Sequence, residues 1–227
     1  MSRDILPRPH NGSSPYRKIN EQGKYCPFPG VTVVSSVGPS NSDLWLHIFQ
    51  ALNGLSKITD HYALLPVDSY HMTTINLFVA ETNPEAWNDH INKNLSWFQN
   101  LAASINKETD FNPEVLSIYP EFHGGIILLR VILPEEQKRK NFELAQKYGI
   151  VNLIPNIQFH ITLGYIYKAI PSQEIEIITR LFEDSIQNIL RNYSKPIRFE
   201  KPELTYFHDM AAFIPWKGER NPFTESV

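Results

Sequence analysis

The chain has 227 residues, of which 42% are hydrophobic, 20% are charged and 12% are aromatic. This is the composition of a globular protein, and it excludes a disordered chain. The net charge of −3 excludes a global basic field, so we expect no extended nucleic-acid binding, only a short partner or a local patch. Cys26 is the only cysteine, which excludes an intrachain disulfide and a zinc site made of cysteines.

The start of the chain, MSRDILPRPHNGSSPYRK, lacks the apolar core of a signal peptide. No apolar run approaches the roughly 18 to 20 residues that a membrane-spanning helix needs. We therefore expect a soluble, cytoplasmic monomer that does not bind membranes. Residues 1–28 are rich in proline, serine, asparagine and charge, which predicts an N-terminal arm.

Apolar periodicity and turn residues predict the elements that follow. The first part of the chain predicts, in order, a strand over 31–37, a helix over 40–55, strands over 61–67 and 70–78, and a helix over 83–107 opened by Asn83 and Pro84. The second part predicts two strands over 114–133 around a turn at His123, a helix over 134–149, a strand over 157–167, a helix over 171–192 and a closing hairpin over 197–216.

Each half of the chain thus has the order strand, helix, strand, helix, hairpin. This order predicts an α+β fold built as a two-lobed repeat, although any α+β protein alternates such elements. We expect one domain over 29–215, with lobes near 29–120 and 121–215 that can exchange strands, followed by a C-terminal tail over 216–227.

Two of the predicted strands contain the same pattern, His-x-Thr. The stretch DSYHMTTINLF carries His71 and Thr73, and NIQFHITLGYIY carries His160 and Thr162. Side chains two residues apart in a strand share one face, so each histidine points the same way as its threonine. Large apolar residues occupy the alternate positions and suit packing under helices. The histidine and threonine faces are then free to line a groove between the lobes.

Two imidazoles that face each other across a groove suit the cleavage of a phosphodiester. A neutral histidine takes a proton from water while a protonated one gives a proton to the leaving alkoxide, both near pH 7. A threonine hydroxyl beside each imidazole can donate to the non-bridging oxygens, where charge accumulates. This chemistry requires no metal or other cofactor. A lone strand histidine is most often structural, so the hypothesis depends on there being two matched copies.

The tetrapeptides HMTT and HITL resemble the paired H-x-[ST]-x motifs of the 2H phosphoesterase superfamily, the two-histidine cyclic phosphodiesterases. The longer stretches YCPFPGVTVV, DSYHMTTINLF, GGIILLRVILPEEQKRKNFELAQKYG and FHITLGYIY resemble one branch of it, catalogued as a domain of unknown function. The resemblance covers residues 16 to 215. Thr74 stands where this branch tends to carry valine, and Gly164 stands where it tends to carry alanine.

This resemblance implies a bilobal fold with a pseudo-twofold axis, in which each lobe is an antiparallel sheet backed by helices and a cleft lies between the lobes. It also implies that His71 and His160 are the general base and the general acid, in an order that the sequence leaves open. Thr73 and Thr162 are then expected to bind the phosphate.

Four further residues are candidates for substrate binding. Arg130 interrupts the apolar run IILLRVIL, where its guanidinium suits phosphate oxygens or, alternatively, an ion pair at the sheet edge. His123 and His208 lie in predicted hairpin turns, where they can rim the cleft or simply be solvated. Tyr165 is the fourth candidate, although strict strand alternation places it opposite His160, in the core.

We therefore expect hydrolysis of a cyclic or 2′-type phosphodiester in a nucleotide or a short RNA end. Metal binding is not expected, because the chain has no H-E-x-x-H motif and no carboxylates near the two histidines in their strands. One alternative is a non-catalytic module that binds a nucleotide or phosphorylated metabolite in the same cleft. Another is an interaction protein whose N-terminal arm occupies the cleft. Lys18 and Tyr25 lie in this N-terminal segment, which can form a flap over the cleft.

Overall fold

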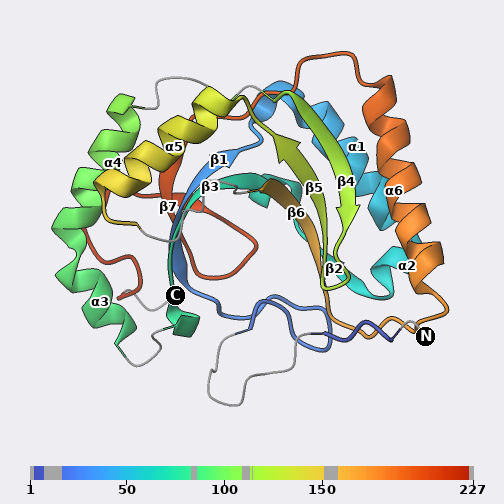
Figure 1. The fold of residues 1–227 in the computed structure, drawn as a ribbon. Coiled ribbons are helices and arrows are strands. Elements are labelled where there is room, and N and C mark those ends of the chain that lie inside the picture. Colours follow the sequence, from blue (N-terminus) through green and yellow to red (C-terminus); the bar gives the residue numbers. More distant parts are fainter. Residues whose placement is uncertain are drawn as a thin grey trace.

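The computed structural model describes residues 3–7, 17–82, 86–108, 113, 115–150 and 158–224. Eight strands in this part of the chain form one antiparallel sheet in the order β4-β5-β6-β3-β1-β7-β8, with β2 paired to β6 outside this path (Figure 1). The strands are β1 Gly30–Ser36, β2 Tyr62–Leu64, β3 His71–Val79, β4 Ser117–Phe122, β5 Ile126–Ile132, β6 Phe159–Ile166, β7 Glu203–Phe207 and β8 Ile214–Pro215.

The helices form two groups on either side of the sheet (Figure 1). Their bounds are α1 Ser42–Asn53, α2 Ser56–Thr59, α3 Trp87–Lys93, α4 Leu95–Glu108, α5 Glu135–Lys147 and α6 Ile175–Asn192. One core is formed by α1, α2 and α6 with the half of the sheet that contains β5 and β6. The other core is formed by α3, α4 and α5 with β1, β3 and β7.

Two helices cross from one half of the sheet to the other. Helix α1 follows β1 in the chain but packs with α6 in the core under β5 and β6. Helix α5 follows β5 but contacts α4 and β3. Both halves of the sheet are therefore covered in part by a helix that the other half supplies, which interlocks them.

The α+β fold class expected from the sequence, with antiparallel strands backed by helices, is confirmed. The strands of both halves join into one hydrogen-bonded sheet rather than two separate sheets, because β3 pairs with β6 at Met72 and Ile161. Among the described residues, no helix is long and apolar enough to cross a membrane.

The single helix predicted over 83–107 is wrong, because α3 and α4 are separate and meet at Asn94. The backbone of Asn94 is not helical (φ −108°, ψ 9°), and its side-chain Nδ2 donates to the carbonyl of His90 at 2.7 Å. Asparagine competes for backbone groups in this way and so interrupts helices. The predicted helix start at Asn83 and Pro84 lies outside the described residues.

The predicted N-terminal arm is described in part. Residues 1, 2 and 8–16 lie outside the described residues. Ile5 exchanges two backbone hydrogen bonds with Ile170, of 3.0 and 2.8 Å, and its side chain packs against the core of α1 and α6. The described start of the chain is therefore held along the segment that leads into α6.

The Met72 side chain, at the junction of the two halves, is expected to contribute strongly to stability. Met72 is 0% exposed, and truncating such a side chain leaves a cavity. Met72→Ala is expected to lower the free energy of unfolding by about 2–5 kcal/mol in urea titrations. The control Leu46→Ala, at a position of α1 that is 49% exposed, is expected to change it by less than about 0.5 kcal/mol. Equal effects of the two substitutions would contradict this account of the junction.

Candidate active site

The two His-x-Thr patterns lie side by side in neighbouring strands. The register of β3 and β6 pairs Met72 with Ile161, which are the middle residues of the two patterns. Both middle side chains are fully buried in the core of α1 and α6. Because alternate side chains of a strand point to opposite faces, their neighbours point away from that core. These neighbours are His71, Thr73, His160 and Thr162.

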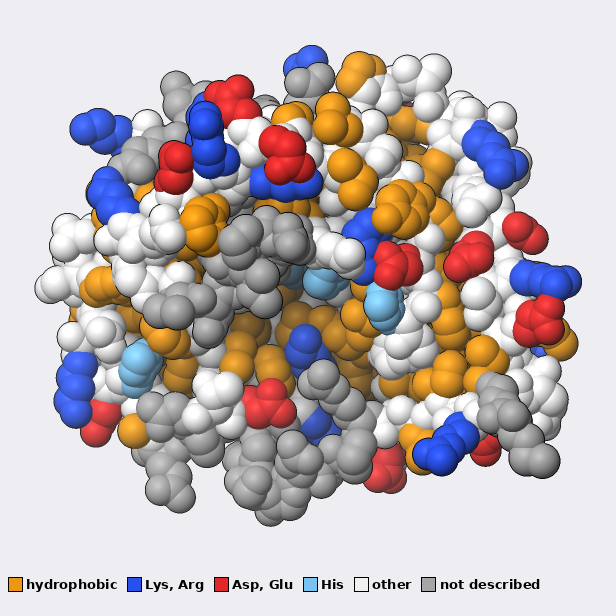
Figure 2. Space-filling model, viewed as in Figure 1, with side chains coloured by type: hydrophobic (Ala, Val, Ile, Leu, Met, Phe, Trp, Pro, Cys, Tyr) orange, Lys and Arg blue, Asp and Glu red, His pale blue; other side chains and the backbone are white. Residues whose placement is uncertain are grey.

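The face to which these four side chains point is hollowed. Figure 2 shows histidine and basic side chains gathered in a hollow at the middle of the molecule, over the position of β3 and β6 in Figure 1. All four residues are partly exposed. Within the described residues, the hydroxyls of Thr73 and Thr162 make no hydrogen bond. Both hydroxyls can therefore donate to a ligand in the hollow.

Each histidine contacts the backbone carbonyl two residues before it. His71 Nδ1 lies 2.7 Å from the carbonyl oxygen of Ser69. His160 Nδ1 lies 3.5 Å from that of Gln158, at the outer limit of a hydrogen bond. A carbonyl oxygen only accepts, so Nδ1 carries the hydrogen in both rings. In the neutral imidazoles, Nε2 then has the lone pair and faces away from the backbone.

A β-bulge follows the threonine in both copies. Val34 pairs with Thr73 and Val33 with Ile75, so that Thr74 is the extra residue in β3. In β6, Leu128 pairs with Thr162 and Ile127 with Gly164, so that Leu163 is the extra residue. The two strands therefore share their irregularity as well as their sequence pattern, at the same position relative to the histidine.

The bulge changes the position of Tyr165. Leu163 and Gly164 are both buried, which interrupts the alternation, and the half-buried Tyr165 lies on the side of His160 and Thr162. Its hydroxyl accepts a hydrogen bond of 3.3 Å from Lys18 Nζ. The expected core packing of Tyr165 is found in part, because its side chain packs against the core of α1 and α6. Its expected direction, away from His160, is wrong, because a bulge shifts every later residue by one position. Tyr165 is thereby retained as a candidate substrate-binding residue.

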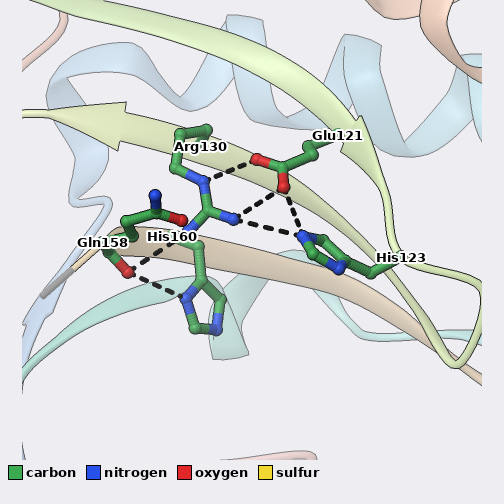
Figure 3. Close-up of polar contacts among 5 residues, drawn as sticks. All are labelled: Glu121, His123, Arg130, Gln158 and His160. Carbon is green, nitrogen blue, oxygen red and sulfur yellow. Dashed lines mark hydrogen bonds and ion pairs between the residues drawn. The ribbon is translucent and has the colours of Figure 1, made fainter.

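Arg130 lies opposite His160 in the β5–β6 pairing and forms a polar cluster with four other residues (Figure 3). Its Nε donates to one carboxylate oxygen of Glu121 at 2.6 Å, and its Nη2 donates to the other at 2.8 Å. Its Nη1 donates to the carbonyl oxygen of Gln158 at 3.3 Å. This same carbonyl faces His160 Nδ1, so Arg130 and His160 share one acceptor.

The Arg130 side chain is only 7% exposed and is paired in the bidentate geometry of a guanidinium with a carboxylate. Glu121 belongs to β4, and sequence analysis did not identify it as the partner. Of the two roles expected for Arg130, the structure contains the ion pair at the sheet edge. Arg130 is therefore placed to hold the Gln158 carbonyl and, through it, the ring of His160.

The two turn histidines lie in different surroundings. His123 Nε2 contacts the carboxylate of Glu121 and lies 3.3 Å from Arg130 Nη2, so His123 belongs to the cluster of Figure 3. His208 packs instead against the rings of Tyr206 and Phe223, at centroid distances of 5.6 and 5.4 Å. Only His123 is thus placed next to a partner of His160.

The Phe213 ring covers one of the paired histidines. Its centroid lies 3.9 Å from that of His71, and it also contacts Phe207 at 4.8 Å. Phe213 precedes β8 in the closing hairpin, and sequence analysis did not single it out. No local sequence signal marks Phe213, because its contact with His71 joins segments more than 140 residues apart.

The environment lowers the pKa of both paired histidines. Burial lowers the pKa of His71 to about 4, although its hydrogen bond to the Ser69 carbonyl opposes this, and the charges of His160 and Lys18 lower it further. Burial also lowers the pKa of His160, again against its contact with the Gln158 carbonyl. Arg130, Lys18 and His123 add to the lowering at His160.

No group of three or more His, Cys, Asp and Glu side chains is arranged to hold a metal ion in the described part of the chain. The paired histidines have threonine hydroxyls and aromatic rings as neighbours. The carboxylate of Glu121, in the cluster beside His160, is already bound to Arg130.

Residues 18–114 match the model of a family described as 2H-phosphodiest, a domain of unknown function (DUF1868). This match includes the first His-x-Thr strand. The predicted resemblance to the 2H phosphoesterases is confirmed over these residues.

Relatives are similar over most of the chain. "Uncharacterized protein 127L" of Invertebrate iridescent virus 6 is 25% identical over 184 residues, which are 68% of this chain and 73% of that protein. The crystal structure of the conserved protein of unknown function ATU0111 from Agrobacterium tumefaciens has a TM-score of 0.69 and 18% identity, and the match covers 93% of this chain and 92% of that one. This structure shares the fold. The structure of Kluyveromyces marxianus Usb1 has a TM-score of 0.41 and 13% identity, with 83% of this chain and 98% of that chain covered.

The Glu121 carboxylate is expected to make stability depend on acid pH. Its hydrogen bonds to Arg130 lower its pKa from 4.5 to about 2. Since the folded pKa lies below the unfolded one, the stabilisation is complete above about pH 4.5 and is lost as the pH falls toward 2. Glu121→Gln removes it, so the difference in free energy of unfolding between wild type and variant should shrink over that range.

Urea titrations between about pH 5 and 2 measure this difference. The matched control is Glu143→Gln, whose carboxylate pairs with Arg139 on the exposed surface of α5 and is expected to matter little. A difference for Glu121→Gln that stays constant over the whole range would contradict the assigned ion pair.

Proposed function

We propose that this chain is a metal-independent phosphoesterase that hydrolyses a cyclic or 2′-type phosphodiester of a nucleotide or RNA end. The observation that carries the proposal is the matched pair of histidines in β3 and β6. Each ring has Nδ1 directed to a backbone carbonyl, so each directs Nε2 away from the backbone on the hollowed face. Similarity to the 2H phosphodiesterase family supports the same class of reaction.

The reaction follows from these two nitrogens. Neutral His71 takes a proton from water at Nε2 as the water oxygen bonds to phosphorus. The bond from phosphorus to the leaving ester oxygen breaks, and protonated His160 gives its Nε2 proton to that oxygen. One water is consumed, and His71 ends with the proton that His160 loses. Proton exchange with solvent restores both rings.

The order of the two roles follows from their environments. His71 has the pKa of about 4, under Phe213, and is therefore neutral over most of the pH range, as a base must be. His160 stands beside the cluster of Arg130 and Glu121, and its Nδ1 faces the carbonyl of the exposed Gln158. A bound phosphodiester anion favours the protonated form of a nearby histidine, which prepares His160 to act as the acid.

The threonine hydroxyls bind the phosphate in this proposal. Thr73 and Thr162 stand beside the two histidines on the same face, one in each strand. Their hydroxyls can donate to the two non-bridging oxygens, which gain charge as the water attacks. Arg130 acts through Gln158 to hold the His160 ring and does not itself contact the phosphate.

Substitution of either histidine tests the catalytic roles. In excess EDTA, wild-type protein is expected to hydrolyse at least one member of a panel of 2′,3′-cyclic nucleotides and short RNA ends. His71→Asn and His160→Asn should each lower kcat by about 10²–10⁴-fold, and Thr162→Val by about 10²-fold. His47→Asn, at an exposed position of α1, is the matched control and should retain activity. Equal turnover by a double variant of His71 and His160 would refute the proposal.

The pH dependence of kcat/KM is expected to be bell-shaped and to lie on the acid side of neutrality. The base must be neutral, so activity rises as the pH passes the pKa of His71, about 4. The acid must be protonated, so activity falls as the pH passes the pKa of His160, which lies below 6.5. Because kcat/KM reports the free enzyme, initial rates at low substrate concentration measure both limbs. An optimum well above about pH 7 would exclude this assignment.

A panel without any turnover would favour the alternative function, a module that binds a nucleotide or phosphorylated metabolite in the same hollow without cleaving it. The cytoplasmic location and the monomeric state expected from the sequence remain predictions. So do the substrate-binding roles of Tyr165, His123 and His208.

A further inference from the structure

A short turn of the N-terminal segment carries a lysine to the paired histidines. Ile19 pairs with Tyr25 as an antiparallel bridge, and the backbone N–H of Cys26 donates to the Lys18 carbonyl at 3.0 Å. The Asn20 side chain closes the turn by accepting two backbone hydrogen bonds of 2.9 Å each. Gly23 has φ +75°, a conformation that favours glycine. The backbone position of Lys18 is therefore fixed within this turn.

The turn is also attached to the domain. The Tyr25 hydroxyl donates at 2.5 Å to the carbonyl of Leu64, the last residue of β2, which pairs with β6. The backbone N–H of Phe28 donates to the His208 carbonyl at 2.7 Å. These two bonds join the turn to segments from both halves of the sheet. Residues 18–25 are thus docked on the domain, as the sequence hypothesis of a flap requires, and Lys18 faces inward.

The Lys18 ammonium has aromatic surroundings. Its Nζ donates to the Tyr165 hydroxyl at 3.3 Å and lies 4.7 Å from the centroid of the Tyr165 ring. It also lies 5.4 Å from the centroid of the Phe28 ring. Among the residues that the structure describes, Lys18 forms no ion pair with a carboxylate. Two of its three N–H groups remain for another acceptor.

Arg130 and Lys18 differ in whether their charge is paired with a carboxylate. Arg130 is the cation that the sequence suggested for phosphate, but its charge is matched by Glu121. Lys18 has no such ion pair among the described residues. Its Nζ contacts Tyr165, which lies in β6 on the side of His160 and Thr162, and its charge lowers the pKa of both His71 and His160. An unmatched cation near two general acid–base groups suits an anion that sits between them.

We propose that Lys18 binds the phosphate of the substrate, as a third donor beside Thr73 and Thr162 and in the role that the sequence suggested for Arg130. This inference rests on the proposed function, because it takes the hollow of His71 and His160 to be the phosphate site. Lysine is a common phosphate ligand that acts as a point charge. The β-bulge contributes by directing Tyr165 to hold the ammonium on the correct face.

Lys18 also links binding to protonation. Its positive charge opposes a proton on either histidine, and the charge of bound phosphate offsets this effect. The groups that face the two rings are the carbonyls of Ser69 and Gln158, Phe213, Lys18, Arg130 with its partner Glu121, and His123. Of the cations among these groups, Lys18 is the one that acts on both rings.

The test uses inorganic phosphate as the probe and the full chain. Lys18→Met removes the charge, Lys18→Arg retains it, and Lys24→Met removes an exposed lysine of the same turn. Titration at neutral pH, followed by NMR and calorimetry, is expected to give about 10- to 100-fold weaker phosphate binding for Lys18→Met. Lys18→Arg should bind within a few-fold of wild type, and Lys24→Met should bind as wild type does.

A second readout needs no ligand. In Lys18→Met, the pKa values of both His71 and His160, measured from their imidazole proton resonances, are expected to rise, because a nearby positive charge is lost. Phosphate binding that is equally tight in Lys18→Met, or absent in wild type, would overturn the inference, as would histidine pKa values that do not change. Urea unfolding midpoints establish that the variants fold.

The outcomes separate this inference from the proposed function. Phosphate binding that depends on Lys18, without turnover of any substrate on the panel, would support the inference and defeat the hydrolase. Turnover by wild type that Lys18→Met leaves unchanged in kcat/KM would support the hydrolase and overturn the inference.

Discussion

The arrangement of the candidate site depends on one backbone pairing. In the described residues, the two halves of the sheet are joined only by the pairing of β3 with β6, at Met72 and Ile161. Both side chains are fully buried in the core of α1 and α6. Strand geometry then determines the rest, because burying these two residues turns the histidine and threonine on each side of them toward the opposite face.

The backbone also determines the protonation chemistry. Each histidine is oriented by a carbonyl two residues before it, so the chain itself selects the tautomer with Nδ1–H. The two halves differ in what surrounds this common unit. His71 lies under Phe213, whereas His160 is supported through Gln158 by Arg130 and Glu121. The two similar strands thus place two imidazoles in equivalent positions. Their different neighbours give the two imidazoles different environments.

The sequence alone predicted the parts of this arrangement that depend on one strand at a time. The pairing of His71 with Thr73 and of His160 with Thr162 follows from a two-residue period, and the order of strands and helices follows from apolar periodicity. The prediction of one helix over 83–107 was wrong at Asn94. There a hydrogen bond from the side chain to the backbone interrupts the helix, although the apolar residues keep helical spacing. The prediction of the sheet face to which Tyr165 points was wrong. A bulge is a feature of two paired strands, and the sequence of either strand alone does not show the pairing.

Partners contributed by distant segments could not be predicted for the same reason. Arg130 was recognised as a charge in an apolar strand, but its partner Glu121 lies on β4, and only the register shows that they meet. Lys18 was recognised as part of a lead-in that could approach the cleft. Its contact with Tyr165 spans 147 residues and depends on the turn at Asn20 and on the bulge in β6.

The most direct test of the central claim is the tautomeric state of the two histidines, measured by long-range ¹H–¹⁵N NMR with and without phosphate. We predict that both His71 and His160 carry the hydrogen on Nδ1 when neutral. We also predict that the Nε2 signals of both shift together in one phosphate titration. An Nε2–H tautomer in either ring, or phosphate that shifts only one of them, would contradict a shared site.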